Sequence, residues 1–138
     1  MSLKETLSDK RSAVVDDCVN LVDREVDGKK GMGGMVIKAG YKAVKGIKPG
    51  FIRTVVDKLF DEWIEKLEPI WAEGDGKPAH LTANSSRVAE ALLAVTDGKV
   101  HGAKSAVVKS TYKKLRPSAK EHVEAAVPGL AAVLGKHT

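Results

Sequence analysis

The chain has 138 residues, of which 43% are hydrophobic and 30% charged, so it is long and apolar enough to form one domain with its own core. The formal net charge is +5 at pH 7, and a single cysteine excludes an intramolecular disulfide bond. No segment approaches the roughly 20 apolar residues of a membrane-spanning helix, and the charged N-terminus lacks a signal-peptide pattern. We therefore expect a cytoplasmic protein with no membrane span.

Helical periodicity dominates the first half of the chain. Apolar residues at three- and four-residue steps predict a first helix from Ser2, where Ser-x-x-Glu has capping-box spacing, to Gly28. A second helix follows a glycine-rich segment and ends at Gly46. The strongest apolar pattern begins at Ile52 and forms a third helix, which Pro69 ends or kinks.

The second half begins after a turn-rich connection at residues 73–80. The segments expected there are a fourth helix from Thr82 or Ser85 to Asp97-Gly98, a fifth over residues 100–115, a sixth from Ser118 and a short last helix from Pro128. Pro117 separates the fifth helix from the sixth, because proline has no backbone N–H to donate. Ser118 is followed three residues later by Glu121, which is the spacing of a capping box.

These patterns predict an all-α fold, with one domain over residues 1–138 built as a compact bundle of about six or seven helices. An internal echo indicates a finer division: residues 36–45 return in similar form as residues 107–116, and both copies follow an Asp-Gly-Lys and precede a proline. The echo predicts an internal repeat of two related three-helix halves, residues 1–72 and 81–138, with 73–80 as the linker. The alternative is that the similarity of the two segments is coincidental.

The two echoed helices each present a row of cations. At about 100° per residue, the cations group on one side of each helix, opposite its apolar residues. The candidate residues are Lys38, Lys42 and Lys45 in the first copy and Lys109, Lys113 and Arg116 in the second. Two interpretations stay open: solvated faces beside acidic helices, or a positive surface for nucleic acid or another polyanion. Tyr41 and Tyr112 lie at the edges of these rows and are candidate interface anchors.

The third helix carries more apolar surface than a single buried stripe requires. Phe60, Trp63 and Ile64 spread around it, which predicts a surface for self-association. Trp63 and Trp71 also stand at helical spacing with Phe60. That spacing is typical of core packing, with an aromatic ligand pocket as the alternative.

Residues for catalysis or for metal or cofactor binding do not assemble into a recognisable pattern. The four histidines are scattered, and Gly31-x-Gly33-Gly34 lacks both the preceding strand and the following Lys-Ser/Thr of a phosphate-binding loop. Cys18 lies among apolar neighbours, which favours a small core residue over a reactive thiol. We predict no catalytic residues, no metal and no cofactor, and an enzyme is the least favoured class.

Five segments of the sequence carry a resemblance to a known family: Ile37–Lys45, Pro49–Phe51, Leu67–Ala72, Val88–Asp97 and Tyr112–Arg116. They resemble a family of small bacterial proteins known only as a domain of unknown function. The resemblance covers nearly the whole chain except Glu73–Ala79. It implies a bacterial, cytoplasmic, all-helical protein, and it brings no established activity or catalytic residues.

We therefore expect a non-enzymatic interaction or scaffold protein that self-associates or binds a protein partner. The alternative is a basic module that binds nucleic acid or another polyanion through the two rows of cations.

Overall fold

The computed structural model describes residues 2–138, of which nearly all belong to helices. In chain order the elements are α1 (Leu3–Leu7), the 3-10 helix η1 (Ser8–Lys10), α2 (Arg11–Asp27), α3 (Gly31–Lys45), α4 (Phe51–Glu73), α5 (Pro78–Ala83), α6 (Ser85–His101) and α7 (Ala106–His137). The chain is 86% helical, and the described residues contain no strand. The prediction of an all-α bundle is confirmed.

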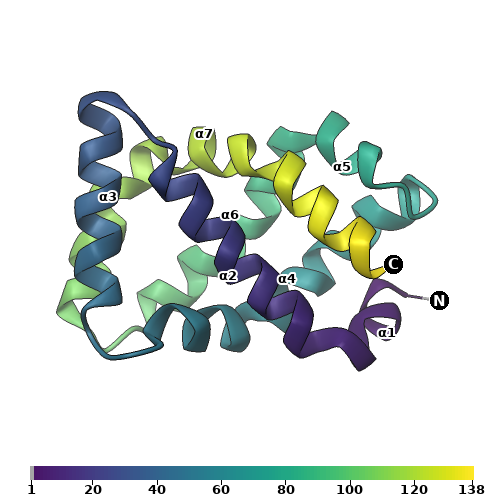
Figure 1. Cartoon of the computed structure of the whole chain (residues 1–138), viewed down its shortest axis with the longest axis horizontal. Coiled ribbons are helices and arrows are strands. Elements are labelled where there is room, and N and C mark those ends of the chain that lie inside the picture. Colours follow the sequence, from purple (N-terminus) through teal and green to yellow (C-terminus); the bar gives the residue numbers. More distant parts are fainter. Residues whose placement is uncertain (1) are drawn as a thin grey trace.

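The helices form an elongated bundle with different elements at its two ends (Figure 1). The long helices α2, α4, α6 and α7 pack against one another through the middle. The N- and C-termini lie together at one end, beside α1, whereas α3 stands at the opposite end, across the bundle (Figure 1). The core runs between the long helices and includes Val14, Phe60, Leu67, Val88 and Leu134, each 5% exposed or less.

Several predicted helix ends in the first half are confirmed, but the first predicted helix is interrupted. The Ser2 hydroxyl accepts a hydrogen bond from the Glu5 backbone N–H at 3.1 Å, as expected of a helix cap, and Gly28 and Gly46 follow the last residues of α2 and α3. The first helix is not continuous, however. It breaks at η1, where the Ser8 hydroxyl donates to the Glu5 carbonyl at 2.9 Å, a local bond that competes with the helical ladder.

Three prolines at which a helix was expected to end, kink or begin lie inside helices. α4 continues past Pro69 to Glu73, and α7 continues through Pro117 and Pro128. An interior proline costs a helix about 3 kcal/mol or more, because it removes a hydrogen bond and crowds the preceding turn. Burial of apolar residues beyond each proline outweighs this cost. The residues concerned are Ile70 and Trp71 in α4 and Val127, Ala131 and Leu134 in α7.

The predicted boundaries around Asp97 and Ser118 are also wrong. Asp97-Gly98 lies inside α6, which continues to His101, whereas Asp27 ends α2. Ser118 caps no helix: its hydroxyl donates to the Leu115 carbonyl at 3.3 Å within α7. The fifth, sixth and last predicted helices are therefore one helix, and Figure 1 shows that α7 changes direction along its length. Part of the predicted linker 73–80 forms the start of α5.

Gly40 brings the two echoed segments side by side. A Cβ atom at this position of α3 would lie 2.9 Å from the Thr111 methyl carbon and 3.2 Å from a Leu115 methyl carbon of α7. Only glycine therefore permits this approach of the two helices without a shift. The first third of α7 consequently runs along α3, behind it in the view of Figure 1.

Candidate functional site: a central apolar cavity and a cationic end

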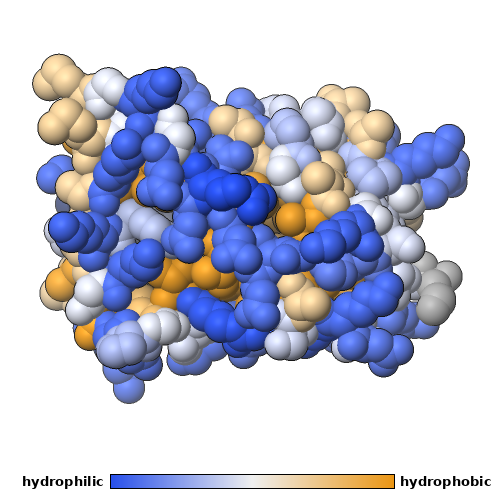
Figure 2. Space-filling view, in the orientation of Figure 1, coloured by the Kyte–Doolittle hydropathy of each residue, from blue (hydrophilic) through white to orange (hydrophobic). Residues whose placement is uncertain are grey.

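A cavity of about 330 Å³ lies inside the bundle. Its wall is made by α2, α3, α4, α6 and α7 together with Lys29, which follows α2. Apart from a few polar residues, the wall consists of valine, leucine, isoleucine, alanine, phenylalanine, tryptophan and cysteine side chains. Figure 2 shows apolar side chains at the surface in the gap bounded by α2, α3 and α4, three of the helices that build this wall.

The three residues predicted to form a self-association surface line this cavity instead. Phe60 is 5% exposed and Ile64 is 3% exposed, and both border the cavity from α4. Trp63 is half-buried, and its indole N–H donates to the Leu92 carbonyl at 3.2 Å. The wide apolar arc on this helix therefore borders the cavity, with Phe60 and Ile64 buried and Trp63 half-buried. Self-association stays a prediction.

The two tryptophans have different surroundings. Trp63 lines the cavity, whereas Trp71 is buried in the core near the end of α4 and does not line the cavity. The core interpretation thus holds for Trp71, whereas Trp63 both packs against the core and borders the cavity. Helical spacing alone did not separate them, because both lie on the inward side of one helix.

Cys18 packs against the core and forms part of the cavity wall. Burial, and to a lesser extent the adjacent Asp17, raises the pKa of the Cys18 thiol to about 11. At neutral pH the side chain is therefore a neutral, weakly polar thiol. This agrees with the prediction of a small core residue rather than a reactive one.

Polar groups on the cavity wall are few. Glu25 and Lys29 form an ion pair at 3.8 Å, with the side chains 31% and 17% exposed, and His122 of α7 also borders the cavity. The Thr96 hydroxyl is engaged elsewhere, because it lies 3.0 Å from the Leu93 carbonyl and 2.8 Å from the Tyr112 hydroxyl. The cavity therefore offers hydrogen-bonding groups from a small set of residues and is otherwise a hydrocarbon surface.

The echoed tyrosines make matching contacts inside the protein. The Tyr41 hydroxyl donates to Asp23 of α2, and Lys45 Nζ lies 3.6 Å from the same carboxylate. Tyr112 donates in the same way to Asp97 of α6. Both tyrosines were predicted as interface anchors with their hydroxyls in water. The structure instead shows each joining its helix to the helix before it.

Burial and the neighbouring carboxylates raise the pKa of both Tyr41 and Tyr112. In the second copy, the Arg116 guanidinium donates two hydrogen bonds to Asp97, at 2.8 and 3.1 Å. Arg116 contributes most to lowering the pKa of the Asp97 carboxyl group, and Tyr112 contributes less. The sequence echo thus corresponds to a shared contact: an aspartate on one helix held by a tyrosine and a cation four residues apart on the next. The internal repeat itself stays a prediction.

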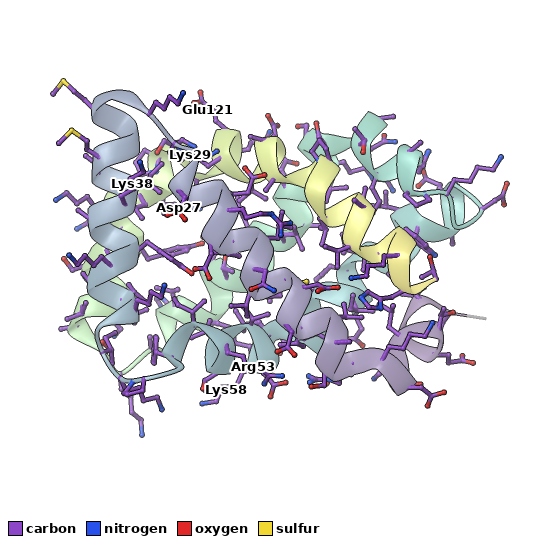
Figure 3. The ribbon with its side chains drawn as sticks, viewed as in Figure 1. Asp27, Lys29, Lys38, Arg53, Lys58 and Glu121 are labelled. Carbon is purple, nitrogen blue, oxygen red and sulfur yellow. The ribbon has the colours of Figure 1, made fainter. Side chains whose placement is uncertain are left out.

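These contacts divide the predicted rows of cations. Lys45 and Arg116 are paired with Asp23 and Asp97. The other four candidates, Lys38, Lys42, Lys109 and Lys113, are exposed and make no ion pair with any other residue of the range 2–138. Figure 3 shows Lys38 on α3 and Lys29 near the end of α2. Because α3 and α7 are neighbours, the four unpaired lysines lie on two adjoining helices.

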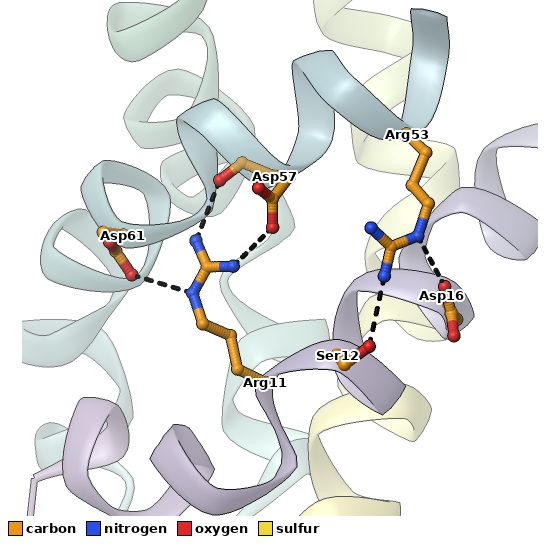
Figure 4. A network of polar contacts seen from close by, with 6 residues as sticks. All are labelled: Arg11, Ser12, Asp16, Arg53, Asp57 and Asp61. Carbon is orange, nitrogen blue, oxygen red and sulfur yellow. Dashed lines mark hydrogen bonds and ion pairs between the residues drawn. The ribbon is translucent and has the colours of Figure 1, made fainter. Parts of the chain in front are cut away.

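A separate polar network joins α2 to α4 and has a structural role (Figure 4). Arg11 of α2 donates to Asp57 and Asp61, and Arg53 of α4 donates to Asp16 at 2.8 Å. Exposed pairs of this kind each stabilise a protein by less than about 1 kcal/mol. The carboxylates are occupied by arginines, so the network holds α2 against α4.

Within residues 2–138, no three histidine, cysteine, aspartate or glutamate side chains gather to hold a metal ion. Over the same range, no helix is both long enough and apolar enough to cross a membrane.

Comparison with known proteins supplies a family. A family model described as a family of unknown function, DUF6918, matches residues 3–138. The chain belongs to this family. No curated protein and no solved structure matches it. The predicted relationship to an uncharacterised family is therefore confirmed, and membership of DUF6918 assigns no activity to the cavity or to the lysines.

Proposed function

We propose that this DUF6918 protein is a non-enzymatic binding protein that holds a small, mainly hydrocarbon molecule in its central cavity. The observation that carries the proposal is the cavity itself: about 330 Å³, bordered by five helices, partly open to the surface and lined almost wholly by apolar side chains. Ligand sites in proteins usually have volumes of about 300–1,000 Å³, apolar walls and a small number of polar groups.

The apolar wall supports a hydrocarbon occupant. Water that fills this space finds few hydrogen-bond partners, because a bound water needs two to four polar groups. A hydrocarbon ligand would instead remove the apolar side chains of the wall from water, which is favourable by roughly 25 cal/mol per Å² of apolar surface.

The wall also limits the class of ligand. Sugars, nucleotides and polyanions need several hydrogen-bond partners once they leave water, and the cavity has few to offer. A single polar head could bond at Glu25, Lys29 or His122, while a hydrocarbon chain fills the space between Phe60, Trp63 and the other helices. We therefore infer a medium-chain compound with at most one polar head, such as a fatty alcohol.

Tryptophan fluorescence provides a direct test. The chain has two tryptophans, so Trp71→Phe leaves Trp63 in the cavity wall as the only reporter. Titration of this variant with dodecanol should shift the Trp63 emission in a saturable way, whereas hexanediol, with a polar group at each end of a short chain, should have little effect. A linear, non-saturating response to dodecanol would contradict the proposal.

A matched pair of substitutions on α7 separates filling of the cavity from a general effect on the helix. Ala126 lines the cavity, whereas its neighbour Ala125 is exposed. Ala126→Leu should occupy part of the space and weaken dodecanol binding at least tenfold, with stability unchanged or increased. Ala125→Leu should bind dodecanol like the parent protein. Equal affinities in the two variants would place the ligand outside the cavity.

A further inference from the structure

The exposed apolar side chains of this protein are concentrated at the α3 end of the molecule. Four large hydrophobic side chains are exposed within the described range: Met32 at 85%, Met35 at 70%, Val36 at 42% and Val107 at 44%. The first three lie on α3, and Val107 lies in the first turn of α7, the helix that packs along α3. Figure 2 shows apolar side chains projecting from this end of α3.

Helix geometry places these residues of α3 on one face. At about 100° per residue, Met32, Met35 and Val36 fall within about 100° of one another, and the exposed Ala39 and Ala43 fall in the same arc. We call these five residues the α3 outer face. A surface helix normally presents polar side chains to water along such an arc. This face is apolar although no other part of the described protein covers it.

Cations border the α3 outer face. Lys38 and Lys42 lie directly beside the apolar arc on α3, and both are exposed and unpaired within residues 2–138. From Gly28 to Gly50 the sequence has six lysines and no acidic residue. On the adjoining α7, the exposed Lys109, Lys113 and Lys114 add further positive charge. An uncovered apolar strip is thus bordered by unpaired lysines of its own helix.

The combination of these features selects one kind of partner. A second copy of the chain, related by a twofold axis, would bring the lysines of one surface against those of the other. Nucleic acid would use the lysines but would leave the two exposed methionines without apolar contacts. An anionic lipid surface uses both features: apolar side chains enter the boundary between headgroups and acyl chains, and lysines approach the phosphates.

We propose that the α3 end of this protein docks on an anionic membrane surface. Met32, Met35 and Val36 enter the interface, and Lys38 and Lys42 contact lipid phosphates. Because no described helix can cross a membrane, this attachment is peripheral. The inner side of α3 contributes Ile37 to the cavity wall, so one helix separates the lipid surface from the cavity. The docking proposal stands on the outer face and does not depend on an occupied cavity.

Vesicle flotation tests the proposal with the full-length protein. The parent protein should float with vesicles made of equal amounts of phosphatidylcholine and phosphatidylglycerol, and should remain in solution with phosphatidylcholine alone. Binding should weaken as salt is raised, because lysine–phosphate attraction is screened. Failure to bind the anionic vesicles at low salt would overturn the proposal.

Three variants assign the binding to residues. Met32→Ser with Met35→Ser should lower vesicle partitioning at least tenfold. Lys38→Gln with Lys42→Gln should lower it about 30-fold, since each lysine near an anionic surface contributes about fivefold in affinity. The control is Lys66→Gln with Lys77→Gln, which removes the same charge from exposed positions on α4 and before α5, and it should bind nearly as tightly as the parent. Equal loss of binding in the two lysine variants would show that only net charge matters, and would overturn the proposal.

Further measurements distinguish the rejected partners. Duplex DNA binding that is lost in the lysine variant but kept in the methionine variant, without vesicle binding, would assign the surface to nucleic acid. A dimer in sedimentation that Met32→Ser with Met35→Ser dissociates, again without vesicle binding, would assign it to a second copy. Dodecanol affinity should be unchanged in the methionine variant, so the failure of this proposal is distinguishable from failure of the ligand proposal.

Discussion

The two ends of the molecule differ in how completely they bury their apolar side chains. At the end where the termini meet, Leu3, Leu7, Leu81 and Leu134 are each 0–1% exposed. At the α3 end, the only large buried apolar side chain of α3 is Ile37, at 9% exposure, while its methionines face solvent. Between the two ends lies the cavity.

Polar contacts follow the same division. At the closed end, Lys10 Nζ donates to the His137 carbonyl at 3.2 Å, and His137 Nε2 lies 2.7 Å from Asp17. The Lys4 backbone N–H donates to Glu68 at 2.8 Å, which joins α1 to α4. α3 has fewer such ties, chiefly the contacts of Tyr41 and Lys45 with Asp23. This comparison indicates that the closed end contributes most of the contacts that stabilise the fold. The α3 end instead leaves surface available for binding.

The largest expected effect compares a leucine at the closed end with one at the cavity. Leu81→Ala should lower the free energy of unfolding by about 2–5 kcal/mol, because the side chain is fully buried and its removal leaves a new void. Leu93→Ala at the cavity wall should cost less, since that side chain already borders open space. Urea denaturation measures both. A greater loss at Leu93 would contradict the comparison.

Cys18 reports on the cavity through its reactivity. Raising the thiol pKa from 9.0 to about 11 lowers the thiolate fraction about 100-fold in mildly alkaline buffer. Alkylation by iodoacetamide, followed by mass spectrometry, should therefore be about 100-fold slower in the native protein than in urea, and dodecanol should slow it further. A native rate equal to the unfolded rate would show that the thiol is not held in the cavity wall.

The two tyrosine–aspartate contacts should differ in strength. Tyr41→Phe should lower the free energy of unfolding by about 1 kcal/mol through loss of its bond to Asp23. Tyr112→Phe should cost more, because the hydroxyl contacts both Asp97 and Thr96. Denaturant unfolding of the single variants and of the double variant tests the order. No loss in Tyr41→Phe would mean that α3 does not depend on this contact.

The smallest expected effect is an acid titration at the closed end. Glu73 accepts from Arg87, with Nη2 2.6 Å from Oε2, and from His80; Arg87 in particular lowers the pKa of Glu73 from 4.5 to about 2. A carboxyl group with a depressed folded-state pKa stabilises the protein above pH 4.5, and this contribution is lost as the pH falls towards 2. The gain is small because the pair is exposed.

An NMR titration of the Glu73 carboxyl carbon should therefore have its midpoint well below 4.5. Glu73→Gln is the control: its stability difference from the parent should shrink as the pH falls from 4.5 to 2 and also when salt is added. A midpoint near 4.5 would show that the contact with Arg87 does not persist in solution.

Features that depend on near neighbours in the chain were predictable from the sequence. The apolar periodicity predicted helices throughout, and the cap at Ser2 and the stops at Gly28 and Gly46 were correct, because a cap or a glycine stop acts over a single turn. The exposed lysines of α3 and α7 were also predictable, since the arc of a helix follows from its sequence. The helix boundaries expected at Pro117 and Pro128, and an end of the helix at Pro69, were not correct, because distant packing compensates for a local cost.

The sequence by itself thus determined that this protein is a bundle of helices, and on which arc of each helix the charged and apolar side chains lie. The tertiary structure decided which of those arcs are covered. Phe60, Trp63 and Ile64 turn out to face a cavity, and Met32 and Met35 face solvent, although all five carry similar apolar character in the sequence. The physical reason is that periodicity specifies the direction of a side chain, whereas burial requires another helix opposite it, and the turns and close approaches such as Gly40 place that helix.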